Sequence, residues 1–169
     1  MLISEKLRNS LCELVGQCFE MNRFLDRGMS LLDTKWVLRN CSKELHPALA
    51  HAFLGDKFAD SIGEYLGSRN ALVDYPATPA GDFDFERPVD FFREFLRKMI
   101  SFQNLLYDVR DEAAEEGDHT TKLFVNGLIK NTSDFVSQAQ LLVDIFEKYG
   151  NTETGLLILD TEIDDYITV

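Results

Sequence analysis

Apolar side chains recur every three or four residues along four long segments, and this spacing constrains the fold more than any other feature. The first segment runs from about Ser4 to the region of Trp36, and its apolar positions follow nearly a heptad repeat. These positions are Leu7, Leu11, Leu14, Cys18, Met21, Leu25, Gly28 and Leu32. Such a stripe is typical of an amphipathic helix that buries one face. Ser4 is a suitable N-cap for this helix.

The second helix is predicted to begin near Ser42 and to end at Gly67. Ser42 can cap its start, and a glycine is a common residue just after a helix end. Pro47 has no backbone N–H, so it is tolerated only in the first turn. We therefore expect one continuous helix that starts only a few residues before Pro47.

The third helix is predicted to follow Pro88 and to end within residues 112–118, which are acidic and include Gly117. The fourth is predicted to begin near His119 and to end at Gly150. Residues 67–88 contain three prolines and two glycines and show no helical period. A 25-residue helix is roughly 37 Å long, so only a long connection can join two parallel helices. The sequence therefore predicts an all-α four-helix bundle with a long crossover between helices two and three.

The bundle is expected to occupy residues 1–150, with a C-terminal tail at 151–169. Residues 156–159 of the tail are all apolar and β-prone. Two interpretations of the tail stay open. It is either a strap or frayed end on its own bundle, or a docking segment at a subunit interface.

The formal net charge is −12, which argues against direct nucleic-acid binding and is compatible with gathering cations. No stretch approaches the ~18 apolar residues of a membrane span. The N-terminus lacks the layout of a secretory signal, so a cytoplasmic protein is expected. The spacing of the three cysteines predicts buried free thiols.

Three short motifs resemble the ferritin-like superfamily, and specifically its ferritin and Dps (mini-ferritin) branches. They are Trp36–Asn40 with Leu45 and His46, Asp60–Glu64, and Glu116–Thr121. The resemblance covers nearly all of residues 1–150 and implies a ferritin-like bundle, a homo-oligomer, iron binding and iron storage. The long crossover is closer to ferritin proper than to Dps.

A di-iron centre inside such a bundle needs glutamates on two helices and Glu-x-x-His motifs on the other two. The four apolar stripes contain no Asp, Glu or His. Aligned with ferritins, the chain has Gly55, Phe58, Tyr107 and Thr132 near the expected ligand positions. The only Glu-x-x-His, Glu116 to His119, spans a predicted turn. We therefore expect the usual internal centre to be absent or heavily altered.

The resemblance to Dps implies a different site, in which one subunit supplies histidine and its two-fold partner supplies Asp and Glu. His46 and Asp60 are fourteen residues apart, or roughly 21 Å along one continuous helix, and would lie on similar faces. An antiparallel neighbour could bring His46 to Asp60 and Glu64, which lie at i and i+4. Dps has a further histidine where this chain has Leu32, beside Asp33. The alternative is a solvated acidic face and a structural His46.

Two functions are therefore carried forward. One is an iron-binding, iron-storing mini-ferritin-like protein, a candidate ferroxidase that oxidises Fe(II) at an intersubunit site formed by His46, Asp60 and Glu64. The other is a non-catalytic ferritin-like scaffold or interaction protein. Zinc or manganese would accept the same ligands as iron.

Overall fold

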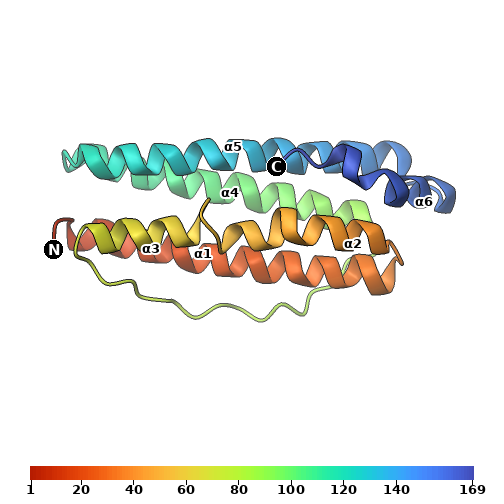
Figure 1. The fold of residues 1–169 in the computed structure, drawn as a ribbon, viewed down its shortest axis with the longest axis horizontal. Helices are drawn as coiled ribbons and strands as arrows, with labels where there is room; N and C mark the ends of the chain where they lie inside the picture. The colour runs from red at the N-terminus through yellow and green to blue at the C-terminus, as the bar shows by residue number, and fades with distance from the viewer.

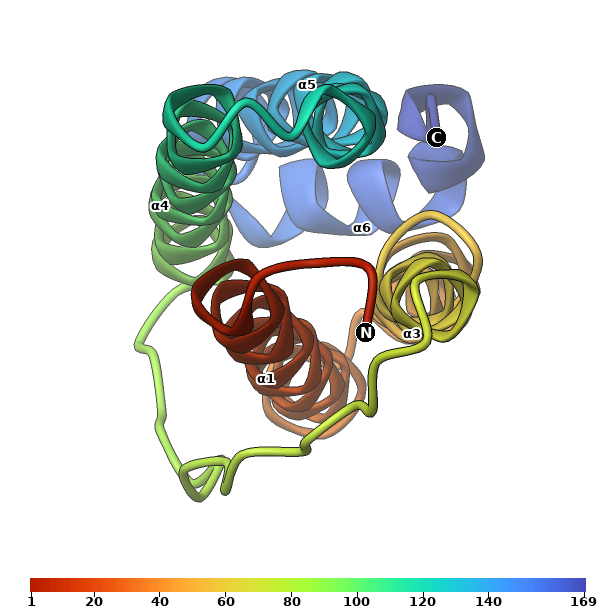
Figure 2. The same cartoon turned by 90° about the vertical axis from the view of Figure 1, so that its left-hand side faces the viewer.

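The computed structural model describes all 169 residues and consists of helices and their connections. Two helical hairpins pack side by side (Figure 1). The first contains α1 (Glu5–Ser30), α2 (Arg39–Leu45) and α3 (Ala59–Ser68), and the second contains α4 (Pro88–Glu115) and α5 (His119–Tyr149). Viewed from the end, α1, α3, α4 and α5 occupy the four corners of a bundle (Figure 2). The prediction of an all-α four-helix bundle is confirmed.

Five shorter elements complete the chain. Two are single π-helical turns, η1 (Leu31–Lys35) and η2 (His46–Ala50), and two are 3₁₀ turns, η3 (His51–Phe53) and η4 (Ile163–Tyr166). The fifth is a short helix, α6 (Glu153–Glu162). Every helix is too short or too polar to cross the hydrocarbon layer of a membrane.

The crossover, residues 69–87, contains no helix or strand and runs along the length of α1 before it reaches α4 (Figures 1 and 2). It joins the end of α3 to the start of α4, and these two helices point the same way, as predicted. Cationic side chains of α1 and η1 hold it in place by donating hydrogen bonds to its backbone carbonyls; they are Arg8, Arg23, Arg27 and Lys35. The crossover is thus fastened to α1 at several points along its length.

The prediction of one continuous second helix is wrong. The helix begins at Arg39, so Pro47 lies in the π-helical turn η2 and not in the first turn of the helix. The His51 N–H bonds to the His46 carbonyl, which widens the helix where Pro47 has no N–H to donate. Residues 54–58 then interrupt the helix before α3 begins.

Burial of two phenylalanines accounts for this interruption. Phe53 and Phe58 are five residues apart and both fully buried, with parallel rings whose centroids are 4.8 Å apart. Positions five apart on a regular α-helix point about 140° away from each other, so a continuous helix would expose one ring. The break turns both rings into the core.

The β-prone interpretation of residues 156–159 is also wrong, because they lie within α6. Thr152 caps this helix by accepting a hydrogen bond from the Gly155 N–H at 3.0 Å. Asp160 accepts a hydrogen bond from the Cys41 N–H of α2 at 2.8 Å, and Leu159 is buried. The tail therefore packs on its own bundle, as the strap interpretation predicted.

Candidate metal centre

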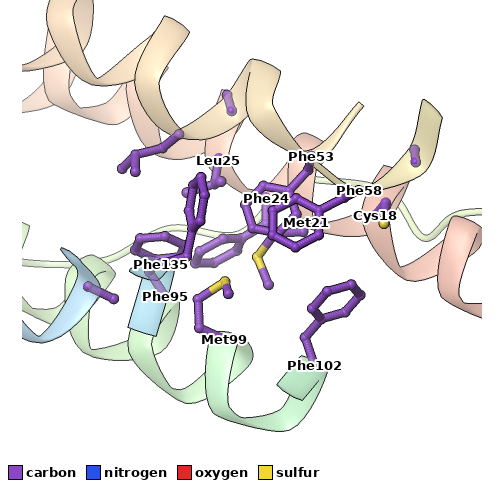
Figure 3. Packing of buried hydrophobic residues seen from close by; sticks show 14 of the residues in the cluster. Cys18, Met21, Phe24, Leu25, Phe53, Phe58, Phe95, Met99, Phe102 and Phe135 are labelled. Carbon is purple, nitrogen blue, oxygen red and sulfur yellow. The ribbon is translucent and has the colours of Figure 1, made fainter. Parts of the chain in front are cut away.

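Four phenylalanines fill the middle of the bundle, and we call them the phenylalanine block: Phe53, Phe58, Phe102 and Phe135 (Figure 3). The Phe135 ring lies 5.4 Å from both Phe53 and Phe58, edge to face. The Phe102 ring lies 5.7 Å from Phe58 in the same arrangement. Edge-to-face rings at these spacings pack favourably, so the centre of the bundle is apolar and well filled.

The polar groups of the core are few and are bonded to protein atoms. Thr121, Thr132 and Gln138 are the buried polar residues, and no Asp, Glu or His is buried. Thr132 donates to the Ile129 carbonyl at 2.7 Å and accepts from the Gln103 amide at 3.0 Å. The apolar stripes, which contain no Asp, Glu or His, are the buried faces of the helices, as the sequence predicted.

The resemblance implies a di-iron group at this level of the bundle, and the residues present do not fit one. Phe58 belongs to the phenylalanine block, Gly55 lies in the break of the second helix, and Thr132 is already bonded. Iron is bound by carboxylate oxygens and imidazole nitrogens, and aromatic hydrocarbon supplies neither.

His46 has two polar neighbours that the sequence patterns did not identify. Its Nε2 lies 2.8 Å from a carboxylate oxygen of Asp26 on α1, and its ring centroid is 4.3 Å from that of His51. The i to i+5 hydrogen bonding of η2 brings His46 and His51 together, since it widens the turn between them. Trp36 lies near the turn of this hairpin, and Asp26 and His46 are the same number of residues before and after it in the sequence. This symmetric spacing is the signal that could have identified the pair.

Asp60 and Glu64 lie on α3, and both are exposed. The break at residues 54–58 separates them from His46. The relative positions estimated for one continuous helix therefore do not apply. The premise that His46 and Asp60 share a face of one helix is therefore wrong. Their meeting across two subunits stays a prediction. Within the chain, no three His, Cys, Asp or Glu side chains converge on a point suited to a metal ion.

Asp33 lies on the same side of the molecule as His46. Asp26, Asp33 and His46 line an open hollow of about 440 Å³, together with the hydroxyl-bearing Ser30 and Ser42. Asp33 is 3.8 Å from the Arg39 guanidinium, a long and exposed ion pair. The hollow thus offers one imidazole and two carboxylates, with the Lys43 ammonium beside them, at the surface between α1, η1 and α2.

The three cysteines lie elsewhere and are buried and free, as predicted. Burial raises the pKa of the Cys18 and Cys41 thiols well above the ordinary value. Both are therefore neutral thiols at physiological pH, and thiolate is the form that binds metals.

The fold of the chain matches that of archaeal ferritins. A ferritin of Archaeoglobus fulgidus, described as having an open pore, superposes with a TM-score of 0.88 at 17% identity, covering 95% of this chain and 97% of that one. An engineered closed form of the same ferritin gives a TM-score of 0.89 at 18% identity, covering 95% and 96% of the two chains. A humanized archaeal ferritin gives 0.88 at 18% identity, covering 95% of each. No protein-family model and no curated protein sequence matches the chain. At these identities the likeness establishes a ferritin-like fold.

Proposed function

We propose that this protein is a subunit of a ferritin-like homo-oligomer that holds iron outside its helical bundle. The phenylalanine block carries the proposal, because it fills the middle of the bundle with four rings that offer no ligand atoms. A carboxylate placed among these rings would lose its hydration and raise the free energy of the folded state by several kcal/mol. Under this proposal the interior of the bundle is structural.

The charge distribution supports iron on the surfaces. The chain has 29 acidic and 17 basic residues, and none of the acidic ones is buried. An acidic surface raises the local concentration of cations, and an oligomer multiplies that effect. The solved structures compared above are ferritins, which favours an assembly that uses the acidity to collect iron.

Native mass and iron content test this proposal together. We expect a defined oligomer that binds added Fe(II), and we expect Tyr107→Phe and Thr132→Val to leave binding and oxidation unchanged. These two substitutions alter the positions that align with ligands of an internal centre. A clear loss of Fe(II) oxidation in either variant, with the oligomer intact, would show that the bundle interior takes part.

The pairing of His46 with Asp26 favours a second and more specific function, the oxidation of Fe(II) at a site between subunits. Under this proposal one subunit contributes His46 and Asp26, and its neighbour contributes Asp60 and Glu64. Imidazole and carboxylate are suitable ligands for iron. Asp26 places a carboxylate beside His46, and its contact with Nε2 fixes the orientation of the His46 ring.

Oxygen or peroxide consumption by Fe(II)-loaded protein tests the intersubunit site. We expect His46→Ala, and the double variant Asp60→Ala/Glu64→Ala, each to lower the oxidation rate by an order of magnitude, as loss of metal ligands does. The double variant Glu115→Ala/Glu116→Ala is the matched control, because it removes two exposed acidic residues at the end of α4. Equal rates in all the variants would rule this site out. An oligomer that takes up no iron at all would support the non-catalytic scaffold instead.

A further inference from the structure

A cavity of about 300 Å³ lies between the crossover, α1 and α4, away from the hollow beside His46. The crossover forms its outer wall, where the Arg23 guanidinium donates hydrogen bonds to the carbonyls of Thr78 and Pro79 at 3.2 and 2.9 Å. A further hydrogen bond, from Arg27 to the Phe83 carbonyl at 2.8 Å, holds the next part of the same wall. The cavity therefore lies between two helices and a crossover wall that hydrogen bonds hold in place.

One wall of the cavity is aromatic. Phe24 of α1 and Phe83 of the crossover stack with centroids 4.8 Å apart and an interplanar angle of 26°. Phe85 packs against both, at 6.4 Å from Phe24 and 5.4 Å from Phe83. Phe83 and Phe85 are only half-buried, so they leave ring surface open to the cavity. A flat apolar group would cover that surface.

The charged side chains at the cavity differ in how closely each is paired with an opposite charge. Glu94 is bound by Arg97, which does not line the cavity, and this contact holds the pKa of Glu94 below its ordinary value. Glu20 reaches Lys98 only at 3.9 Å, and the Lys98 ammonium lies over the Phe24 ring, 5.1 Å from its centroid. Arg23 forms hydrogen bonds to carbonyls and no ion pair. An uncompensated guanidinium and a loosely paired ammonium thus line one small cavity of an acidic protein.

We propose that this cavity binds a small aromatic carboxylate. The ring of the ligand lies against Phe83 and Phe85, and its carboxylate accepts hydrogen bonds from Arg23 and Lys98. A volume of about 300 Å³ is at the small end of ligand sites, which suits one or two fused rings. Arg is well suited to this task because its planar guanidinium matches a carboxylate.

Calorimetric titration of the intact protein with 2-naphthoate tests the proposal. We expect one saturable site per chain with a Kd on the order of 0.1 mM, ordinary for a ligand of this size in a good pocket. We expect Arg23→Gln and Lys98→Gln each to weaken 2-naphthoate about 10-fold and to change the binding of the uncharged 2-naphthamide less than about 2-fold. Phe83→Ala is expected to weaken both ligands.

Lys130→Gln on α5 is the matched control, because it removes an exposed positive charge far from the cavity wall. Thermal melting of each variant shows whether the crossover stays in place, and Lys98→Gln keeps all the crossover hydrogen bonds of Arg23. Three results would overturn the proposal: no saturable binding up to about 1 mM, equal effects of Arg23→Gln and Lys130→Gln, or equal affinity for acid and amide. If a second copy of the chain occupied the cavity, no saturable binding of 2-naphthoate would be seen.

Discussion

The two hairpins of the bundle differ in regularity. In the second hairpin, α4 and α5 are unbroken helices of 28 and 31 residues joined by a short turn. The first hairpin contains one unbroken helix, α1, and then a second helical segment with a π-helical turn, a 3₁₀ turn and a five-residue break. The crossover starts from this irregular side.

The irregular helix brings together two pairs of residues that a regular helix would separate. Phe53 and Phe58 meet inside the bundle, and His46 and His51 meet on its surface. Both pairs are five residues apart, a spacing that points side chains about 140° away from each other on an α-helix. The inner pair fills the middle of the bundle, and the outer pair includes His46, one of the ligands proposed for iron.

The largest effect is expected from removing a ring of the phenylalanine block. Phe58→Ala should lower the free energy of unfolding by about 3–5 kcal/mol, the usual cost of a large cavity in a packed core. Phe146→Ala in the regular hairpin is the comparison, since Phe146 is also buried and packs on Phe92 at 4.5 Å. Urea denaturation measures both. A cost below about 1 kcal/mol for Phe58→Ala alone would show that the broken segment collapses into the cavity.

Two glycine substitutions compare a site where the hairpins are in close contact, Gly28, with a site that has free space around it, Gly127. A methyl group on Gly28 of α1 would overlap the Phe91 ring of α4, so Gly28→Ala should destabilise by about 1–3 kcal/mol. Gly127 of α5 has nothing within 4 Å of the same position, so Gly127→Ala should stabilise by about 0.5–1 kcal/mol. Opposite shifts in the melting temperature are expected. Shifts of the same sign would contradict the close approach of α1 to α4.

The sequence predicted the regular hairpin well because its signals are local. Pro88 begins α4, Asp118 caps α5 by accepting from the Thr121 N–H, and Gly117 has the positive φ of 73° that the turn needs. The irregular helix was predicted poorly because its shape depends on distant partners. Nothing near Phe58 in the sequence says that its ring must pack against Phe135 of α5 and Phe102 of α4.

The candidate site shows the same limit. His46 was identified from a motif, but its partner Asp26 lies twenty residues away and on a different element. Such a contact follows from how α1 and α2 pair in the hairpin, and it has no local pattern. The burial of the apolar stripes, in contrast, needed only the helical period and was predicted correctly.

A smaller effect is expected where the tail caps the irregular helix. Leu38 offers no side-chain cap to α2, and Asp160 of α6 accepts a hydrogen bond from the Cys41 N–H instead. Asp160→Ala should therefore cost about 1 kcal/mol, the ordinary value of a lost cap. It should also speed proteolysis of the tail. Asp118→Ala removes the local cap of α5 and should cost a similar amount without exposing the tail, so faster tail cleavage in both variants would contradict this assignment.

The smallest effect is expected at the fastening of the crossover to the irregular hairpin, and it depends on pH. Lys35 lies 2.8 Å from the Asp84 carboxylate, and its hydrogen bond holds the pKa of Asp84 below the ordinary value of 3.8. Because the folded-state pKa is lowered, this contribution to stability is present above pH 3.8 and is lost as the pH falls through the folded-state pKa. Lys35→Gln should therefore lower the urea midpoint slightly at pH 7, and this difference from the unmodified protein should shrink in acid and in high salt. A difference that stays constant with pH would assign the effect to the hydrogen bond from Lys35 to the Phe85 carbonyl.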